Sequence, residues 1–146
     1  MATLMRDPGE TSLDTLLATL TTVLDPTTYV FTTVPGDKDL PPLRDVQLLF
    51  REDEGVTVVT SLEVAAARRM EYFFPCKRIT LNVTSSLEAV GFMAVIATRL
   101  ATKSMGVNPV SGFYHDHLFV PLGRENEALA ELKALADEKK AQIGKA

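Results

Sequence analysis

The clearest pattern in the sequence is an alternation of apolar and polar residues that changes to a helical period. Over residues 78–83 every second position is apolar, as in a strand with one buried face. Over residues 86–105 apolar side chains recur on most faces of a helix, which indicates a helix buried against a sheet. Ser85 stands three residues before Glu88, the spacing of a capping box, so we expect this helix to begin at about Ser86.

The rest of the chain reads as short strands and one-sided helices. The doublet Asp25-Pro26 is expected to end the first helix and precede the first strand. A tight turn at His115-Asp116 is expected to join the last two strands, because Asp and His tolerate left-handed backbone conformations. The expected elements, in order, are helix 11–20, strands 29–34, 46–50 and 56–60, helix 61–70, strand 78–83, helix 86–105, strands 108–114 and 117–122, and helix 125–142.

This order of elements predicts the fold class. The last five elements, strand-helix-strand-strand-helix, match a ferredoxin-like split βαβ unit without its final strand. The first half resembles a second, diverged unit. We therefore expect an α+β fold of tandem ferredoxin-like units, residues 1–74 and 75–146, which share one antiparallel sheet with helices packed on one face.

Composition narrows the function classes. The 146 residues are 46% apolar, enough to bury a core, and the net charge of −4 without a basic run argues against nucleic acid as a partner. Cys76 is the single cysteine, which excludes an internal disulfide and a multi-cysteine metal site. Residues 1–10 lack the apolar run of a secretory signal, and no window reaches the ~20 apolar residues that cross a bilayer. We expect a soluble, cytoplasmic protein without a membrane partner.

The expected topology brings two polar segments together. In a split βαβ unit the turn at residues 84–86 and the hairpin tip at residues 114–117 fall at the same end of the sheet. Together they supply a helix N-terminus, two serine hydroxyls, one carboxylate and two imidazoles. Backbone amides with Ser85 or Ser86 suit an α-carboxylate, and Asp116 suits an α-amine. The sequence therefore predicts a site for a zwitterion, without a cofactor or metal.

Two motifs extend this reading by resemblance. Ser-Ser-Leu-Glu-Ala-Val-Gly at 85–91 and Phe-Tyr-His-Asp-His-Leu-Phe-Val-Pro at 113–121 closely resemble a family of small tandem ACT-domain proteins, and the likeness covers nearly the whole chain. The motifs are also similar to the ACT modules of aspartate kinases and of the cytosolic arginine sensor. The resemblance implies ferredoxin-like ACT units, which in regulatory proteins bind amino acids at the interface between two units. We expect a ligand-binding regulatory protein without a catalytic role, and a homodimer. The ligand-binding residues that we expect are Ser85, Ser86, Leu87, Glu88, Gly91, His115, Asp116 and His117.

Two other classes of protein stay open at this point. A small ferredoxin-like enzyme could use His115 and His117, whose ordinary pKa values lie near neutrality, for acid-base or metal chemistry. The chain offers no third histidine and no catalytic-looking cysteine. A purely structural dimerisation module is the third class, and an exposed sheet edge would be its evidence.

Overall fold

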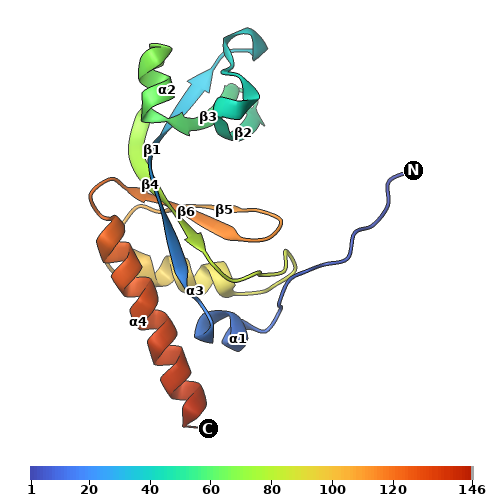
Figure 1. Cartoon of the computed structure of the whole chain (residues 1–146), viewed down its shortest axis with the longest axis vertical. Helices are drawn as coiled ribbons and strands as arrows, with labels where there is room; N and C mark the ends of the chain where they lie inside the picture. The colour runs from blue at the N-terminus through green and yellow to red at the C-terminus, as the bar shows by residue number, and fades with distance from the viewer. Residues whose placement is uncertain (146) are drawn as a thin grey trace.

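The computed structural model describes residues 1–145 and is built around one six-stranded sheet (Figure 1). The strands run in the order β2-β3-β1-β4-β6-β5, and every neighbouring pair is antiparallel. This confirms the expected α+β fold. The elements are α1 (Leu13–Ala18), β1 (Thr22–Val34), 3-10 turns at Asp37–Asp39 and Leu43–Asp45, β2 (Val46–Glu52), β3 (Gly55–Ser61), α2 (Leu62–Ala67), β4 (Phe73–Leu81), α3 (Phe92–Ala101), β5 (Asn108–Ser111), β6 (Asp116–Pro121) and α4 (Glu125–Gly144).

Several predicted elements are confirmed, and two of the helices begin with a serine cap. The Ser12 hydroxyl accepts a hydrogen bond from the Thr15 amide (3.3 Å) at the start of α1, and Ser61 caps α2 through the Val64 amide (3.1 Å). Such caps are typically worth ~1 kcal/mol because they satisfy amides that the first helical turn leaves unpaired. The β2–β3 hairpin and the long helix α4 also form where the periodicity predicts them.

The main core lies between the sheet and three helices. Helices α1, α3 and α4 gather at one end of the molecule, opposite the β2–β3 hairpin and α2 (Figure 1). Ile96 of α3 and Leu132 of α4 are fully buried against Ile79 and Leu118 of the central strands. Burying an aliphatic side chain of this size stabilises the fold by ~1.5–3 kcal/mol. This apolar core holds α3 and α4 against the sheet near the end of β4, where the chain leads into α3.

A second apolar cluster shows that the sheet is curled. The ring of Phe119 packs edge-on against Tyr29 and Phe31, with centroids 5.8 and 5.6 Å apart. Leu48 of β2 and Val110 of β5 pack against the same cluster, although these strands are the two opposite edges of the sheet. The sheet therefore bends around these rings, and edge-to-face aromatic pairs contribute ~0.5–1.5 kcal/mol each beyond their burial.

Strand β1 differs from the prediction. It begins at Thr22 and contains Asp25-Pro26, which we expected to end the preceding helix. A register shift interrupts the pairing with β4 between Leu24 and Thr28, so the proline, which has no amide proton, lies where no ladder bond is required. The prediction was therefore wrong: α1 already ends at Ala18, and Asp25-Pro26 lies inside β1.

The two halves contribute strands to one continuous sheet. The central pair β1–β4 joins a strand of the first half to a strand that begins at Phe73. The expected boundary between residues 74 and 75 falls inside β4, and the division into units 1–74 and 75–146 stays a prediction. Among the helices of residues 1–145, none combines the length and apolar character needed to span a bilayer.

Candidate functional site

The segment between β4 and α3 is an irregular loop, which corrects the predicted capping box. Helix α3 begins at Phe92 rather than Ser86, and Gly91 is its N-cap with φ +90°, a left-handed conformation that favours glycine. The Ser85 amide donates to the carbonyl of Val83 (3.2 Å), so it is not available to the Glu88 side chain. The Glu88 amide instead donates to the Ser86 hydroxyl (3.0 Å).

The N-terminal segment occupies the turn at Ser85 and Ser86. Glu10 pairs with Ser85 as an isolated parallel bridge, through Glu10 N–H to Thr84 O (2.8 Å) and Ser86 N–H to Glu10 O (3.0 Å). Gly9 lies so close that a Cβ built there would be 2.3 Å from the Ser86 amide nitrogen. The amides that we expected to be free for a ligand are therefore engaged by the protein's own chain.

The same segment brings a carboxylate to the turn. The Ser86 hydroxyl donates to one carboxylate oxygen of Asp7, and the Gly9 amide donates to the other (2.8 Å). These hydrogen bonds hold the pKa of the Asp7 carboxyl below its usual value, because they favour the ionised form. Ser86 is thus positioned to bind a carboxylate, and in this structure the carboxylate is an internal one.

Asp116 connects the turn to the β5–β6 hairpin. It is 8% exposed and is the first residue of β6, which corrects the predicted turn at His115-Asp116. Its two carboxylate oxygens accept hydrogen bonds from Ser85 Oγ (2.8 Å) and Ser111 Oγ (2.6 Å). No lysine or arginine among residues 1–145 forms an ion pair with this carboxylate. The prediction that the two segments meet at one end of the sheet is confirmed by the Ser85–Asp116 contact.

The two histidines lie beside this contact but have separate partners. His115 Nδ1 is 3.0 Å from the carbonyl oxygen of Val83, and His117 Nδ1 is 2.9 Å from Thr80 Oγ1. Burial, followed by the charges of Arg78 and His115, lowers the pKa of His117, so its ring is neutral near pH 7. The neutral ring can exchange a hydrogen bond with Thr80 but does not supply a positive charge.

The remaining predicted residues differ in their surroundings. Leu87 is 64% exposed and Glu88 is also exposed on the loop, so neither lines an enclosed pocket. Gly91 serves the backbone, since a Cβ there would lie 3.5 Å from Leu13 Cδ2 and would be strained by the positive φ. No group of three or more His, Cys, Asp or Glu side chains arranged to hold a metal occurs within residues 1–145.

A cavity lies beside the turn, on the side of α1. Its volume is about 360 Å³, and its polar wall includes Glu10, Thr15 and Thr84. Ligand pockets typically measure ~300–1,000 Å³. The cavity reaches the turn at Thr84, but Ser86 and Asp116 do not line it. A larger cavity, about 640 Å³, lies elsewhere, between β1 and α4.

Four residues at this end of the sheet were missed from the sequence. Asp7, Gly9 and Glu10 come from a segment without hydrophobic periodicity, so the local pattern gave no signal of their contact with residue 86. Ser111 pairs directly with Asp116 across the hairpin. Correct placement of the turn at residues 112–115 would have identified it.

The architecture is ferredoxin-like, with one curled six-stranded antiparallel sheet, and the sequence comparisons assign its family. The chain belongs to the ACT domain family, a family of regulatory ligand-binding modules. Residues 8–77 match the family's ACT domain profile. A protein of unknown function from Vibrio cholerae, described as a possible transport protein, is 37% identical, with 85% of this chain and 95% of that chain covered and a TM-score of 0.73.

More distant solved structures share the fold alone. Protein Atu0741 from Agrobacterium tumefaciens is 15% identical, with a TM-score of 0.65 over 80% of this chain and 89% of that one. The regulatory subunit of aspartate kinase from Thermus flavus is 10% identical, with a TM-score of 0.56 over 78% and 95% of the two chains. No curated protein matches the sequence significantly.

Proposed function

We propose that the protein is a regulatory module that binds an amino acid, or a similar small zwitterion, without catalysing a reaction. The ligand's amine binds Asp116, and its carboxylate binds the amide and hydroxyl of Ser86. Ser85 holds Asp116 in place, and His115 and His117 flank the site. We also predict that residues 1–74 and 75–146 form two domain units, that the protein is a homodimer, and that it is located in the cytoplasm.

The environment of Asp116 carries the proposal. A carboxylate that is nine-tenths buried usually has a cationic partner, because desolvation makes an unpaired buried charge costly. Asp116 has two hydroxyl donors and no cation in the described chain. A primary ammonium group donates three hydrogen bonds and supplies the missing positive charge.

The contact between Asp7 and Ser86 supports the other half of the assignment. The Ser86 hydroxyl already donates to a carboxylate, that of Asp7, so a carboxylate fits at this position. A ligand carboxylate at the same atoms would have to displace residues 7–10. Ligand binding and docking of the N-terminal segment are therefore competing equilibria in this proposal.

Calorimetric titration of the full chain with each of the twenty amino acids tests the proposal. We expect binding of at least one amino acid, with affinity reduced about tenfold or more in Asp116→Asn, since this change removes the charge but keeps the shape. Ser86→Ala should also weaken binding. Asp137→Asn removes an equivalent charge from the exposed face of α4 and should bind as the unmodified protein does.

The outcomes are separable. A heat of binding for one or a few amino acids that disappears in Asp116→Asn but persists in Asp137→Asn supports the site. The absence of a heat of binding for all twenty amino acids contradicts the proposed ligand class. Binding that persists in both Asp116→Asn and Ser86→Ala contradicts the site.

A further inference from the structure

One edge of β1 lacks a neighbouring strand over half its length. Strand β3 pairs with β1 only over Tyr29–Val34, whereas β4 pairs with the opposite edge from Thr22 onward. Within residues 1–145, no strand therefore covers the β3-side edge of β1 over residues 22–28. Such an edge presents backbone N–H and C=O groups that can pair with another extended chain.

The register identifies which backbone groups face outward. The Asn82 amide donates to the carbonyl of Thr21 (2.8 Å), so the polar groups of residue 21 point toward β4. Because the direction alternates along an antiparallel strand, those of Val23 also point toward β4. The N–H and C=O groups of Thr22 and Leu24 consequently point to the unpaired edge.

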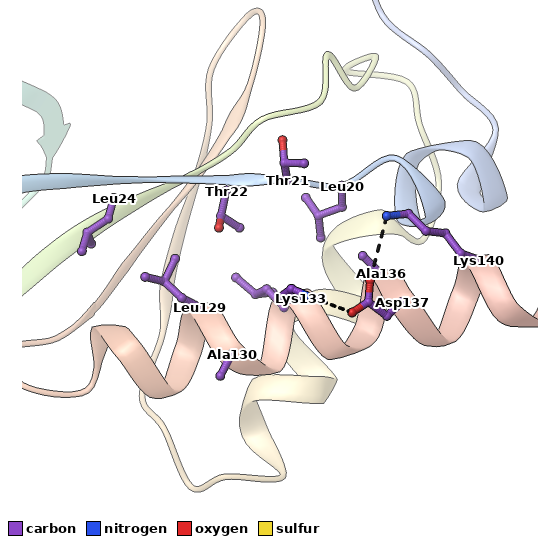
Figure 2. Close-up of a pocket in the computed structure, with 11 residues that line it drawn as sticks. Leu20, Thr21, Thr22, Leu24, Leu129, Ala130, Lys133, Ala136, Asp137 and Lys140 are labelled. Atoms are coloured by element: carbon purple, nitrogen blue, oxygen red, sulfur yellow. Dashed lines mark hydrogen bonds and ion pairs between the residues drawn. The ribbon is translucent and has the colours of Figure 1, made fainter.

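Helix α4 lies alongside this edge and forms the second wall of a groove. Figure 2 shows Thr22 and Leu24 pointing from β1 toward the helix and Leu129 pointing from the helix toward the strand. The cavity between them has a volume of about 640 Å³, and Ala130 lies at its rim, with its methyl group pointing away from β1 in Figure 2. A strand edge beside a helix, with an apolar groove between them, is the arrangement into which an added peptide strand fits.

The rim of the groove is positively charged overall. Lys133 and Lys140 both line it, and Asp137 is its one acidic residue. The Lys133 amino group lies 2.7 Å from the Asp137 carboxylate, whereas that of Lys140 lies 3.9 Å away. One positive charge in excess stays at the rim, which favours an acidic partner.

We propose that the groove between β1 and α4 binds an extended acidic peptide segment of another protein, by strand addition to the edge at Thr22–Leu24. Alternate apolar side chains of the peptide pack against Leu24 and Leu129, and an acidic side chain or terminal carboxylate pairs with Lys140. This site is separate from the Ser85–Asp116 site and does not depend on it.

The charges favour a peptide over a second copy of this chain. Two copies that paired through this edge would be related by a two-fold axis, so each copy would bring the same net positive rim to the interface. Like charges opposed in this way disfavour association, whereas an acidic strand meets them with the opposite sign.

Selection of random twelve-residue peptides displayed on phage, against the full chain, tests the proposal. We expect selected peptides to be acidic with alternating apolar residues. Their binding, measured with the synthetic peptides, should fall about tenfold or more in Thr22→Trp, because Thr22 points from β1 toward α4 and a larger side chain there fills the groove (Figure 2). Ala141→Trp places the same side chain on the exposed surface of α4 outside the groove and should bind normally.

Amide hydrogen exchange distinguishes strand addition from simple groove binding. With the selected peptide bound, the Thr22 and Leu24 amides should gain protection, because they would donate to the added strand. The Val23 amide, which faces β4, should change little and is the internal control. Protection at Val23 alone, or at none of the three, contradicts strand addition.

The charge assignment has its own control. Lys140→Glu should weaken binding of the acidic peptides. Lys38→Glu makes the same change at an exposed residue that does not line the groove, and it should leave binding unchanged. Selection of no peptide, or of peptides that bind equally to Thr22→Trp, overturns the proposal. Self-association of the unmodified protein in light scattering that Thr22→Trp abolishes also overturns it, because the groove would then hold a second copy.

Discussion

Gly9 offers the sharpest perturbation of the candidate site, because its place against the Ser86 backbone leaves no room for a side chain. In Gly9→Ala the new Cβ would lie 2.3 Å from the Ser86 nitrogen and 2.4 Å from its Cα. Neither neighbour is the flexible end of a side chain. We expect residues 7–10 to detach from the turn in this variant.

The magnitude follows from the bonds that detachment breaks. The backbone bonds from Glu10 to Thr84 and from Ser86 to Glu10 contribute about 1 kcal/mol each, on the usual net value of a protein hydrogen bond. Replacing glycine by alanine offsets about 0.4–1 kcal/mol by restricting the unfolded chain. The free energy of unfolding should therefore fall by about 1–2 kcal/mol, without loss of the fold, because Gly9 and its segment lie outside the apolar cores.

Urea unfolding followed by circular dichroism measures this change, and amide exchange at Ser86 localises it. Gly106→Ala is the matched control, since nothing lies within 4 Å of a Cβ at Gly106, and its stability should change by less than about 0.5 kcal/mol. Because detachment also frees the Ser86 amide and hydroxyl, Gly9→Ala should bind the amino-acid ligand about tenfold more tightly. Unchanged stability together with a still protected Ser86 amide would refute the reasoning.

Three further predictions concern single side chains. Burial and nearby positive charge lower the pKa of His117, so on acidification the unfolded chain is protonated at this residue before the folded protein is. The contribution of His117 to stability should be fully present above about pH 6.5 and should fall as the pH drops below that value. Urea titrations at several pH values should find a smaller fall in His117→Gln. Burial raises the pKa of Cys76 to about 12, so the native protein should not react with Ellman's reagent at pH 8, whereas the urea-unfolded protein should react with one equivalent. Arg99 bridges Glu131 and Glu138 between α3 and α4, so Arg99→Ala should lower the free energy of unfolding in urea titrations by about 1 kcal/mol, less at high salt.

Periodicity was sufficient for most of the fold, because most elements bury a regular apolar face. The helices expected at 11–20 and 125–142 and the alternation over residues 78–83 correspond to α1, α4 and β4. The start of α3 was wrong for a physical reason. The spacing of Ser85 and Glu88 fits a capping box, but the turn's backbone pairs with Glu10, a contact between distant segments that local spacing does not reveal.

The site shows the same division. Topology predicted that the turn and the hairpin would meet, and Ser85 does contact Asp116. The topology did not predict that Ser85 and Ser111 would both donate hydrogen bonds to Asp116, or that Asp7 would accept one from Ser86. Whether a polar group is free depends on its whole environment, and a sequence pattern describes only its neighbours along one element.

A crystal structure of the full chain, soaked with the amino acid that gives the largest heat of binding, tests the central claim most directly. The account predicts the ligand's amine within hydrogen-bond distance of Asp116 and its carboxylate at Ser86, with residues 7–10 displaced from the turn. Ligand density away from both residues, or an occupied ligand site with Asp7 still bonded to Ser86, would contradict it.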